Sequence, residues 1–114
     1  MDFQIIIVGK LGGASVKKIE VNEHLGTDTP DDYIVLAYLS FDRANSKGTT
    51  KKMIEQYNNE IGALVGNMEQ NAQILTIFWK VPYQQKDTNL AKTNLERADT
   101  KMKFKSNWFA RALN

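Results

Sequence analysis

The sequence predicts an α+β fold: a two-layer sandwich in which one main amphipathic helix covers one face of a mainly antiparallel sheet of about five strands, in the order β-β-β-α-β-β. One observation is a stripe of apolar residues, spaced by three and four positions, between residues 49 and 68. The other is a set of short segments around it that are rich in β-branched and aromatic residues. The chain has 114 residues and shows no repeat or linker, so residues 1–114 are expected to form a single domain.

The predicted helix has a distinct apolar side and recognisable ends. Thr49 or Thr50 is the expected N-cap, with Ser46 as the less favoured alternative. The helix should end near Gly66 and Asn67, because glycine and asparagine commonly adopt the left-handed conformation at a helix C-terminus. The apolar stripe consists of Met53, Ile54, Tyr57, Ile61, Leu64, Val65 and Met68. The solvent side is expected to carry Lys51, Lys52, Glu55, Gln56, Asn58, Asn59, Glu60 and Gly62.

The part of the chain before the helix predicts three strands. Residues 3–8 are rich in β-branched side chains and end at a glycine-containing turn, residues 9–13, which should lead into a second strand over residues 14–21. A bulge at Lys17 and Lys18 would bring the apolar residues of this second strand onto one face. A loop over residues 22–32 then precedes the third strand, Tyr33–Phe41. This strand is apolar at both parities, which is typical of a central strand with cover on both sides.

The part of the chain after the helix predicts two further strands. Residues 73–81 are apolar at almost every position and end at Pro82, which cannot donate a backbone hydrogen bond. The polar residues 84–94 are expected to form a loop. Residues 100–106 alternate between lysines and apolar side chains, which predicts a half-buried strand. The last residues, 107–114, fit either a helical turn or a short strand.

The composition excludes several classes of protein. The chain contains no cysteine, so a disulfide framework, a zinc finger and a thiol nucleophile are all excluded. No apolar run approaches the roughly 20 residues that a membrane span requires. No signal peptide is visible, which slightly favours a cytoplasmic location and leaves an exported form with its signal removed open. The net charge is +2, and the excess of basic residues lies in the second half of the chain.

Three features resemble ligand sites only superficially. Gly9, Gly12 and Gly13 follow a predicted strand, but their spacing matches neither the Walker loop nor the dinucleotide fingerprint, so a hairpin turn is favoured. The acidic loop with Asp28, Asp31 and Asp32 lacks the calcium-hand pattern. His24 is the only histidine, and the chain has neither a cysteine nor a second histidine that could join it in a metal site. We therefore predict no catalytic residue, metal or cofactor, and expect a protein that is not an enzyme.

The C-terminal region combines basic and aromatic residues, and two interpretations compete for it. Basic side chains that meet phosphates, beside aromatic rings that stack on bases, are typical of single-strand nucleic-acid binding. Lysines along an outer strand also discourage edge-to-edge aggregation, in which case Phe104 and Trp108 simply complete the core. The second interpretation is favoured. The candidate interaction surface consists of Lys101, Lys103, Lys105, Arg111 and Trp108.

A sheet covered by one helix has a second face, and the functional prediction is based on the residues of that face. Tyr33, Val35 and Trp79 are assigned to it, which makes it partly apolar. An apolar face of this kind is closed either by the chain's own loops and C-terminal segment or by another chain. The preferred hypothesis is a non-catalytic protein-interaction module whose partner is another protein or a second copy of the chain. The alternative is a small nucleic-acid-binding domain that uses the basic C-terminal strand.

Overall fold

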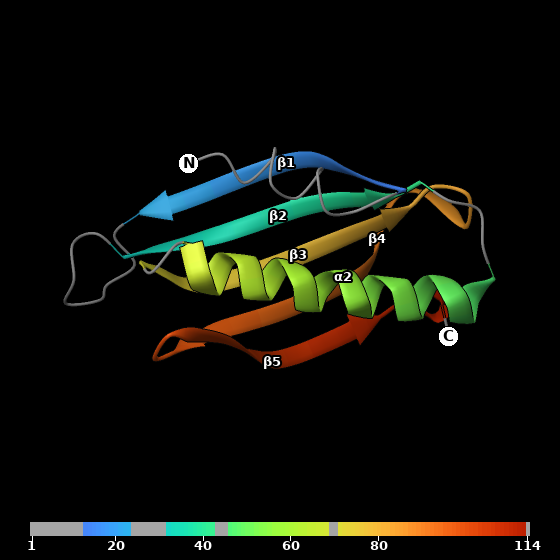
Figure 1. The fold of residues 1–114 in the computed structure, drawn as a ribbon. Helices are drawn as coiled ribbons and strands as arrows, with labels where there is room; N and C mark the ends of the chain where they lie inside the picture. Colours follow the sequence, from blue (N-terminus) through green and yellow to red (C-terminus); the bar gives the residue numbers. More distant parts are fainter. Residues whose placement is uncertain (1–12, 24–31, 43–45, 69–70, 114) are drawn as a thin grey trace.

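A computed structural model describes residues 13–23, 32–42, 46–68 and 71–113, and this part of the chain forms an α+β fold with one long helix on a five-stranded sheet (Figure 1). The predicted two-layer, mainly antiparallel fold is therefore confirmed. The predicted strand over residues 3–8 lies outside the described residues. The elements are β1 Ala14–Glu23, β2 Tyr33–Phe41, α2 Lys47–Met68, β3 Ala72–Val81, β4 Gln85–Ala98, β5 Lys101–Phe109 and the 3-10 helix η1 Arg111–Leu113.

The strands lie in the order in which they occur in the chain, β1-β2-β3-β4-β5. All neighbouring pairs are antiparallel except β2 and β3, which are parallel. A parallel pair needs a long crossover connection, and α2 lies within that connection (Figure 1). β2 pairs on both sides, which confirms its prediction as an interior strand. The two outer strands of the described sheet are β1 and β5.

The predicted bulge in β1 is present. The pairing register between β1 and β2 shifts between Val16 and Lys18. The extra residue restores a common side for the apolar residues, which would otherwise alternate out of phase. The resulting pairs are Val16 with Leu39, Ile19 with Ala37 and Val21 with Val35.

The prediction of a loop over residues 84–94 is wrong, because the long strand β4 begins at Gln85. Its polar composition has a structural reason. One side of β4 faces away from the helix and carries residues such as Lys92 and Glu96. The helix-facing side buries Ala91, Thr93 and Leu95, which are too few apolar residues to produce a recognisable strand pattern.

The helix begins one turn earlier than the preferred prediction, so the assignment of Thr49 or Thr50 as N-cap is wrong. The backbone N–H of Thr49 donates to the Ser46 hydroxyl over 3.2 Å, and the N–H of Thr50 donates to the Ser46 carbonyl over 2.9 Å. Ser46, the less favoured alternative, is the cap. Thr50 is instead fully buried, and its hydroxyl lies 2.5 Å from that of Tyr83.

Two glycines of the helix, Gly62 and Gly66, face the sheet and not solvent. Gly62 is buried, and a Cβ atom there would lie 2.8 Å from Cδ2 of Leu95, so its assignment to the solvent side is wrong. A Cβ atom on Gly66 would lie 3.3 Å from the backbone nitrogen of Met102. The helix also continues past Gly66 to Met68, and Gly66 has no positive φ. These glycines therefore allow α2 to approach β4 and β5 closely.

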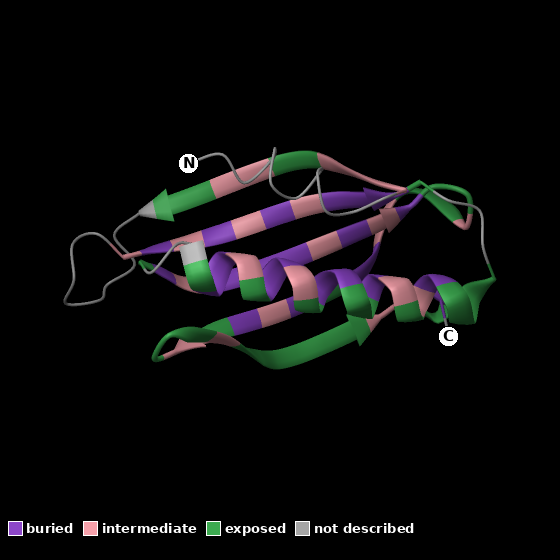
Figure 2. Cartoon of the chain, in the orientation of Figure 1, coloured by how far each residue is buried: buried purple, intermediate pink, exposed green. Residues whose placement is uncertain are grey.

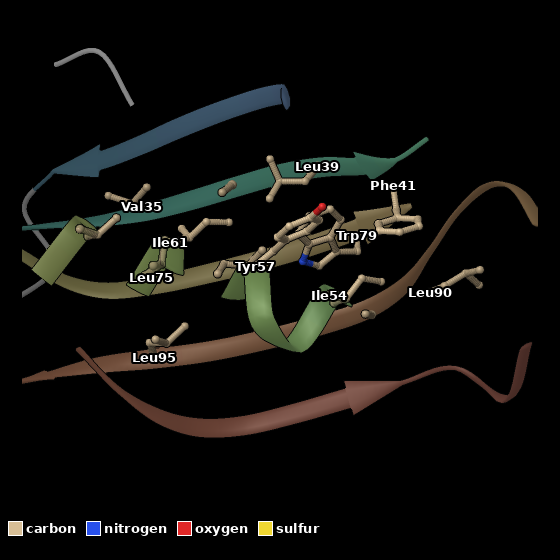
Figure 3. Close-up of a cluster of buried hydrophobic side chains, with 14 of the residues drawn as sticks. Val35, Leu39, Phe41, Ile54, Tyr57, Ile61, Leu75, Trp79, Leu90 and Leu95 are labelled. Carbon is tan, nitrogen blue, oxygen red and sulfur yellow. The ribbon is translucent and has the colours of Figure 1, made fainter. Parts of the chain in front are cut away.

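The core lies between α2 and one face of the sheet, which we call the covered face (Figures 2 and 3). The predicted stripe is confirmed for its central residues, because Ile54, Tyr57, Ile61 and Val65 are buried while Met53 and Leu64 are half-buried. The ring of Tyr57 stacks on that of Trp79, with 5.9 Å between centroids. From the sheet, the largest fully buried side chains are Trp79, Phe41, Leu39, Leu75, Ile77, Leu90, Leu95 and Val35.

Candidate binding surface on the uncovered sheet face

The opposite side of the sheet is covered by none of the described helices, and we call it the uncovered face. It carries the side chains that alternate with those of the covered face. Tyr33, Val35 and Trp79 were predicted to lie here, and this assignment is wrong: all three are buried under α2. The second face is partly apolar, as predicted, through residues of the other parity such as Tyr38 and Phe78. Apolar residues at both parities of β2 and β3 left the choice of face undetermined.

A row of aromatic and basic side chains crosses the whole uncovered face. Five paired positions, one from each strand, form it: Lys18, Tyr38, Phe78, Lys92 and Trp108. The rings of Tyr38 and Phe78 are stacked, with centroids 4.8 Å apart and planes 7° from parallel. Nζ of Lys92 lies 5.5 Å from the centroid of Phe78. Trp108, at the β5 end, is 51% exposed, so the row ends in an aromatic ring that is open to solvent.

A second row, made of polar side chains, runs beside the first across β3, β4 and β5. The hydroxyl of Thr76 donates to Oδ1 of Asn94 over 2.8 Å. Nδ2 of Asn94 donates in turn to the hydroxyl oxygen of Ser106, also over 2.8 Å. This hydrogen bonding orients the amide of Asn94 and leaves the Ser106 O–H free to act as a donor at the surface. The face therefore offers stacking and hydrogen-bonding groups side by side.

Lysines outnumber acidic residues on this face. Two ion pairs lie on it, Lys18–Glu20 at 2.5 Å and Lys105–Glu96 at 3.3 Å. The hydrogen bond and the charge of Glu20 raise the pKa of Lys18. Within the described residues no acidic side chain pairs with the remaining lysines of the face. These are Lys80, Lys92, Lys101 and Lys103.

The predicted C-terminal surface is brought together in part. Lys101, Lys103 and Lys105 are all exposed. Lys103 pairs with Glu96, and Lys105 forms an ion pair with the same glutamate, so Lys103 and Lys105 lie on the uncovered face. Trp108 lies on this face as well. Arg111 is exposed but lies beyond β5, on η1, which contacts α2. The expectation that Phe104 and Trp108 complete the core is wrong, because they are 42% and 51% exposed.

A buried polar network on the covered face was missed from the sequence. Nε1 of Trp79 donates to Oδ1 of Asn58 over 2.8 Å, and Nδ2 of Asn58 donates to the Thr93 hydroxyl oxygen over 2.9 Å. Thr93 then donates to Oδ1 of Asn107, which is exposed. Asn58 was expected on the solvent side of α2 but is 1% exposed. The buried indole N–H requires an acceptor, and Asn58 supplies it.

A hollow lies between α2 and β5 on the helix side of the sheet. It has a volume of about 350 Å³ and passes beside the exposed ring of Phe104. A second hollow of about 370 Å³ shares Gly66, Asn67 and Thr100 with it and reaches Arg97. Arg97 donates from Nε to the carbonyl of Ala72 over 2.8 Å and from Nη1 to the carbonyl of Gly66 over 3.4 Å, so it joins the end of α2 to β3 and β4. The first hollow is lined by Asn59, Gly62, Ala63, Gly66, Asn67, Thr100, Lys101, Met102 and Phe104.

No group of three or more histidine, cysteine, aspartate or glutamate side chains that could hold a metal ion occurs within the described part of the chain. His24, Asp28, Asp31 and most of the predicted turn over residues 9–13 lie outside the described residues. Gly13 is described and has a φ of 80°, which is compatible with a turn. Across the same described ranges, no helix is long and apolar enough to cross a membrane.

Comparison of the chain with family models, curated proteins and solved structures finds no match. The function is therefore argued from the surfaces described above. Two of them stand out: the aromatic and basic row of the uncovered face, and the outer edge of β5 with its neighbouring hollow.

Proposed function

We propose that the protein is a non-catalytic domain that binds single-stranded nucleic acid on the uncovered face of its sheet. The observation that carries this proposal is the exposure of Trp108 at the end of a row that also contains the stacked rings of Tyr38 and Phe78. Unstacked bases bind to such rings through their π-faces, whereas the bases of a duplex are already stacked on one another. The row therefore favours single-stranded over double-stranded nucleic acid.

The charges of the face support the same ligand. Lys92 lies within the aromatic row, and Lys101 and Lys103 lie on the strand that carries Trp108. A phosphate backbone that follows a row of stacked bases would pass within reach of these ammonium groups. Phosphate contacts of this kind supply much of the affinity and make it depend on salt. The polar row of Asn94 and Ser106 supplies hydrogen-bonding groups for base edges.

The test compares two exposed aromatic residues of one strand. Trp108→Ala should weaken the binding of a fluorescently labelled ten-nucleotide single strand by about 1–3 kcal/mol, the range for loss of one stacked base. Phe104→Ala, on the covered side of the same strand, should leave the affinity unchanged. Fluorescence anisotropy at low salt gives both values. No binding by the unmodified protein, or equal losses in the two variants, would contradict the proposal.

The salt dependence gives a second, independent readout. Each phosphate contact on a single strand contributes about 0.7 to the magnitude of the slope of log affinity against log salt. Replacing Lys101, Lys103 and Lys105 together by glutamine should therefore reduce that magnitude by roughly 2. A slope that stays the same would show that these lysines do not meet phosphates.

A protein-interaction module, the preferred hypothesis from the sequence, remains the second candidate. The outer position of β5 favours it, because an outer strand offers backbone groups to another strand. This surface is distinct from the aromatic row, so the two functions are compatible in one domain.

A further inference from the structure

The outer edge of β5 is open to an additional strand. β5 pairs with β4 on one side, and no described element pairs with its other side. In an antiparallel pair, alternate residues direct their backbone N–H and C=O groups away from the partner strand. The edge of β5 therefore presents a row of donors and acceptors along residues 101–107. An extended peptide satisfies such groups by adding to the sheet.

Beside this edge, on the helix side, lies the hollow between α2 and β5. Its wall from β5 includes the side chains of Met102 and Phe104, which pair with Arg97 and Leu95 of the covered face. Phe104 is 42% exposed even though it faces the apolar side of the sheet. The wall from α2 includes Gly62 and Ala63, which leave room because they carry little or no side chain. An apolar side chain from an added strand would cover Phe104 and fill this space.

The other side of the same edge is positively charged. Lys101 and Lys103 face the uncovered side, and β5 contains no acidic residue. Across an added strand, directly opposed side chains share a face. Acidic residues of the added strand would therefore be favoured opposite these lysines. The residues that alternate with them in the added strand would face the hollow.

We propose that the free edge of β5 binds an extended acidic segment of a partner protein as an additional strand, in which acidic residues alternate with apolar ones. The apolar residues occupy the hollow between α2 and β5, and the acidic residues meet Lys101 and Lys103. A smaller hollow of about 130 Å³, lined by Phe104 and Asn107, continues the first one along the edge, so that together they extend from Thr100 to Asn107. Lys105 is the extra residue at the register shift between β4 and β5, so about seven residues of the added strand are required. The hollow and the backbone edge of β5 are distinct from the aromatic row, although both proposals use Lys101 and Lys103. Strand addition does not depend on the proposed nucleic-acid binding.

A second copy of the chain is a poor occupant of this edge. Pairing β5 with β5 would bring the lysines of two copies together, and like charges on paired strands are destabilising. The lysines thus exclude self-pairing and select an acidic strand.

The experiment titrates the isotope-labelled 114-residue protein with a nine-residue peptide of alternating glutamate and valine whose termini are blocked. We expect amide shift changes along β5 and in the α2 residues around Ala63, with slower hydrogen exchange at the outward-facing amides of β5. A peptide of the same composition, with its glutamates and valines in two separate blocks, should bind at least tenfold more weakly. An alternating peptide in which every backbone nitrogen is methylated should also fail, because it lacks backbone donors.

Two protein variants locate the site. Ala63→Phe fills the hollow from an exposed helix position and should reduce affinity for the alternating peptide at least tenfold. Gln56→Phe adds the same ring at an exposed helix position that does not line the hollow, and should leave affinity unchanged. Absence of binding, equal binding of the block peptide, shift changes centred on Phe78 and Trp108, or a dimer formed through β5 would each overturn the proposal.

The two proposals fail separately. Ala63→Phe should leave oligonucleotide binding intact, because Ala63 lies on the helix side. Trp108→Ala should leave binding of the alternating peptide intact, because Trp108 lies on the uncovered face. Loss of peptide binding in both variants would overturn strand addition at β5, whatever the oligonucleotide result.

Discussion

The covered and uncovered faces of the sheet each contain one tryptophan, and the two differ in burial. Trp79 is fully buried beneath α2 and stacks with Tyr57 (Figure 3). It donates its indole N–H to Oδ1 of Asn58. Trp108 is half exposed and lies at the outer end of an aromatic row. Both occur in segments rich in aromatic residues, so residue type alone does not decide burial. The position of α2 determines which of the two tryptophans is buried.

The polar networks of the two faces differ in the same way. On the covered face, the hydrogen bonds from Trp79 through Asn58 to Thr93 are buried, so each partner depends on the others. On the uncovered face, the hydrogen bonds of Asn94 lie at or near the surface, where water can replace a lost partner. A buried network determines stability, whereas a surface network is available to a ligand.

The largest expected effect compares the two tryptophans. Trp79→Ala removes a buried ring and leaves Asn58 without its donor, so it should lower the free energy of unfolding by about 3–5 kcal/mol. Trp108→Ala should lower it by about 1 kcal/mol or less, because half of the ring is already in water. Chemical denaturation measures both values. Similar losses would show that the uncovered face is packed as a core.

The next effect compares two asparagines. Asn58→Ala leaves the Trp79 N–H and the Thr93 hydroxyl without their partner in a dry site, so it should cost about 1–3 kcal/mol. Asn94→Ala should cost less than about 1 kcal/mol. Asn59→Ala, next to Asn58 but exposed, serves as the helix control and should change little. A loss at Asn59 equal to that at Asn58 would show that the helix is rotated from its assigned position.

A smaller effect compares two glycines of α2. Alanine is favoured over glycine in a helix by up to about 1 kcal/mol, so Gly48→Ala, where a Cβ atom meets nothing within 4 Å, should be neutral or stabilising. Gly62→Ala should instead lower the free energy of unfolding by about 1 kcal/mol, because the new methyl group lies against the buried side chain of Leu95. Thermal denaturation distinguishes the two, and a stabilising Gly62→Ala would contradict the close approach of helix and sheet.

The smallest effect on stability is expected for the lysines of β5. Replacing Lys101, Lys103 and Lys105 by glutamine should change the free energy of unfolding by no more than about 0.5 kcal/mol, because all three are exposed and their one ion pair is solvated. The variant should aggregate faster, because the outer strand has lost the charges that discourage self-pairing. Static light scattering at rising concentration tests this, and unchanged solubility would mean that the lysines do not protect the edge.

Periodicity predicted the elements better than it predicted their orientation. The helix stripe, the bulge at Lys17 and Lys18 and the interior strand β2 follow from patterns within one segment. The choice between the two faces of β2 and β3 does not, because both parities are apolar. Only the placement of α2 decides that Trp79 is buried and that Phe78 is not.

The candidate site could be predicted only in part for related reasons. The alternation of lysines in β5 was visible in the sequence, and so was Trp108 beside them. The rest of the row was hidden, because Lys92 belongs to a strand too polar to be recognised. Asn58 gave no signal either, since a single asparagine on a helix is usually solvated. Its burial depends on the indole of Trp79, which is distant in the sequence.

The single parallel pairing of the sheet, between β2 and β3, has a consequence for the order of folding. β3, β4 and β5 are joined by short turns and can pair as soon as neighbouring segments meet, whereas β2 and β3 pair only after residues 42–71 have been brought back across the sheet. Closing that longer connection costs chain entropy before any contact compensates for it. In pulse-labelling hydrogen exchange during refolding, we therefore expect amides shared by β3, β4 and β5 to gain protection before those between β2 and β3. The C-terminal half would then present its aromatic and lysine side chains before β2 has paired with β3.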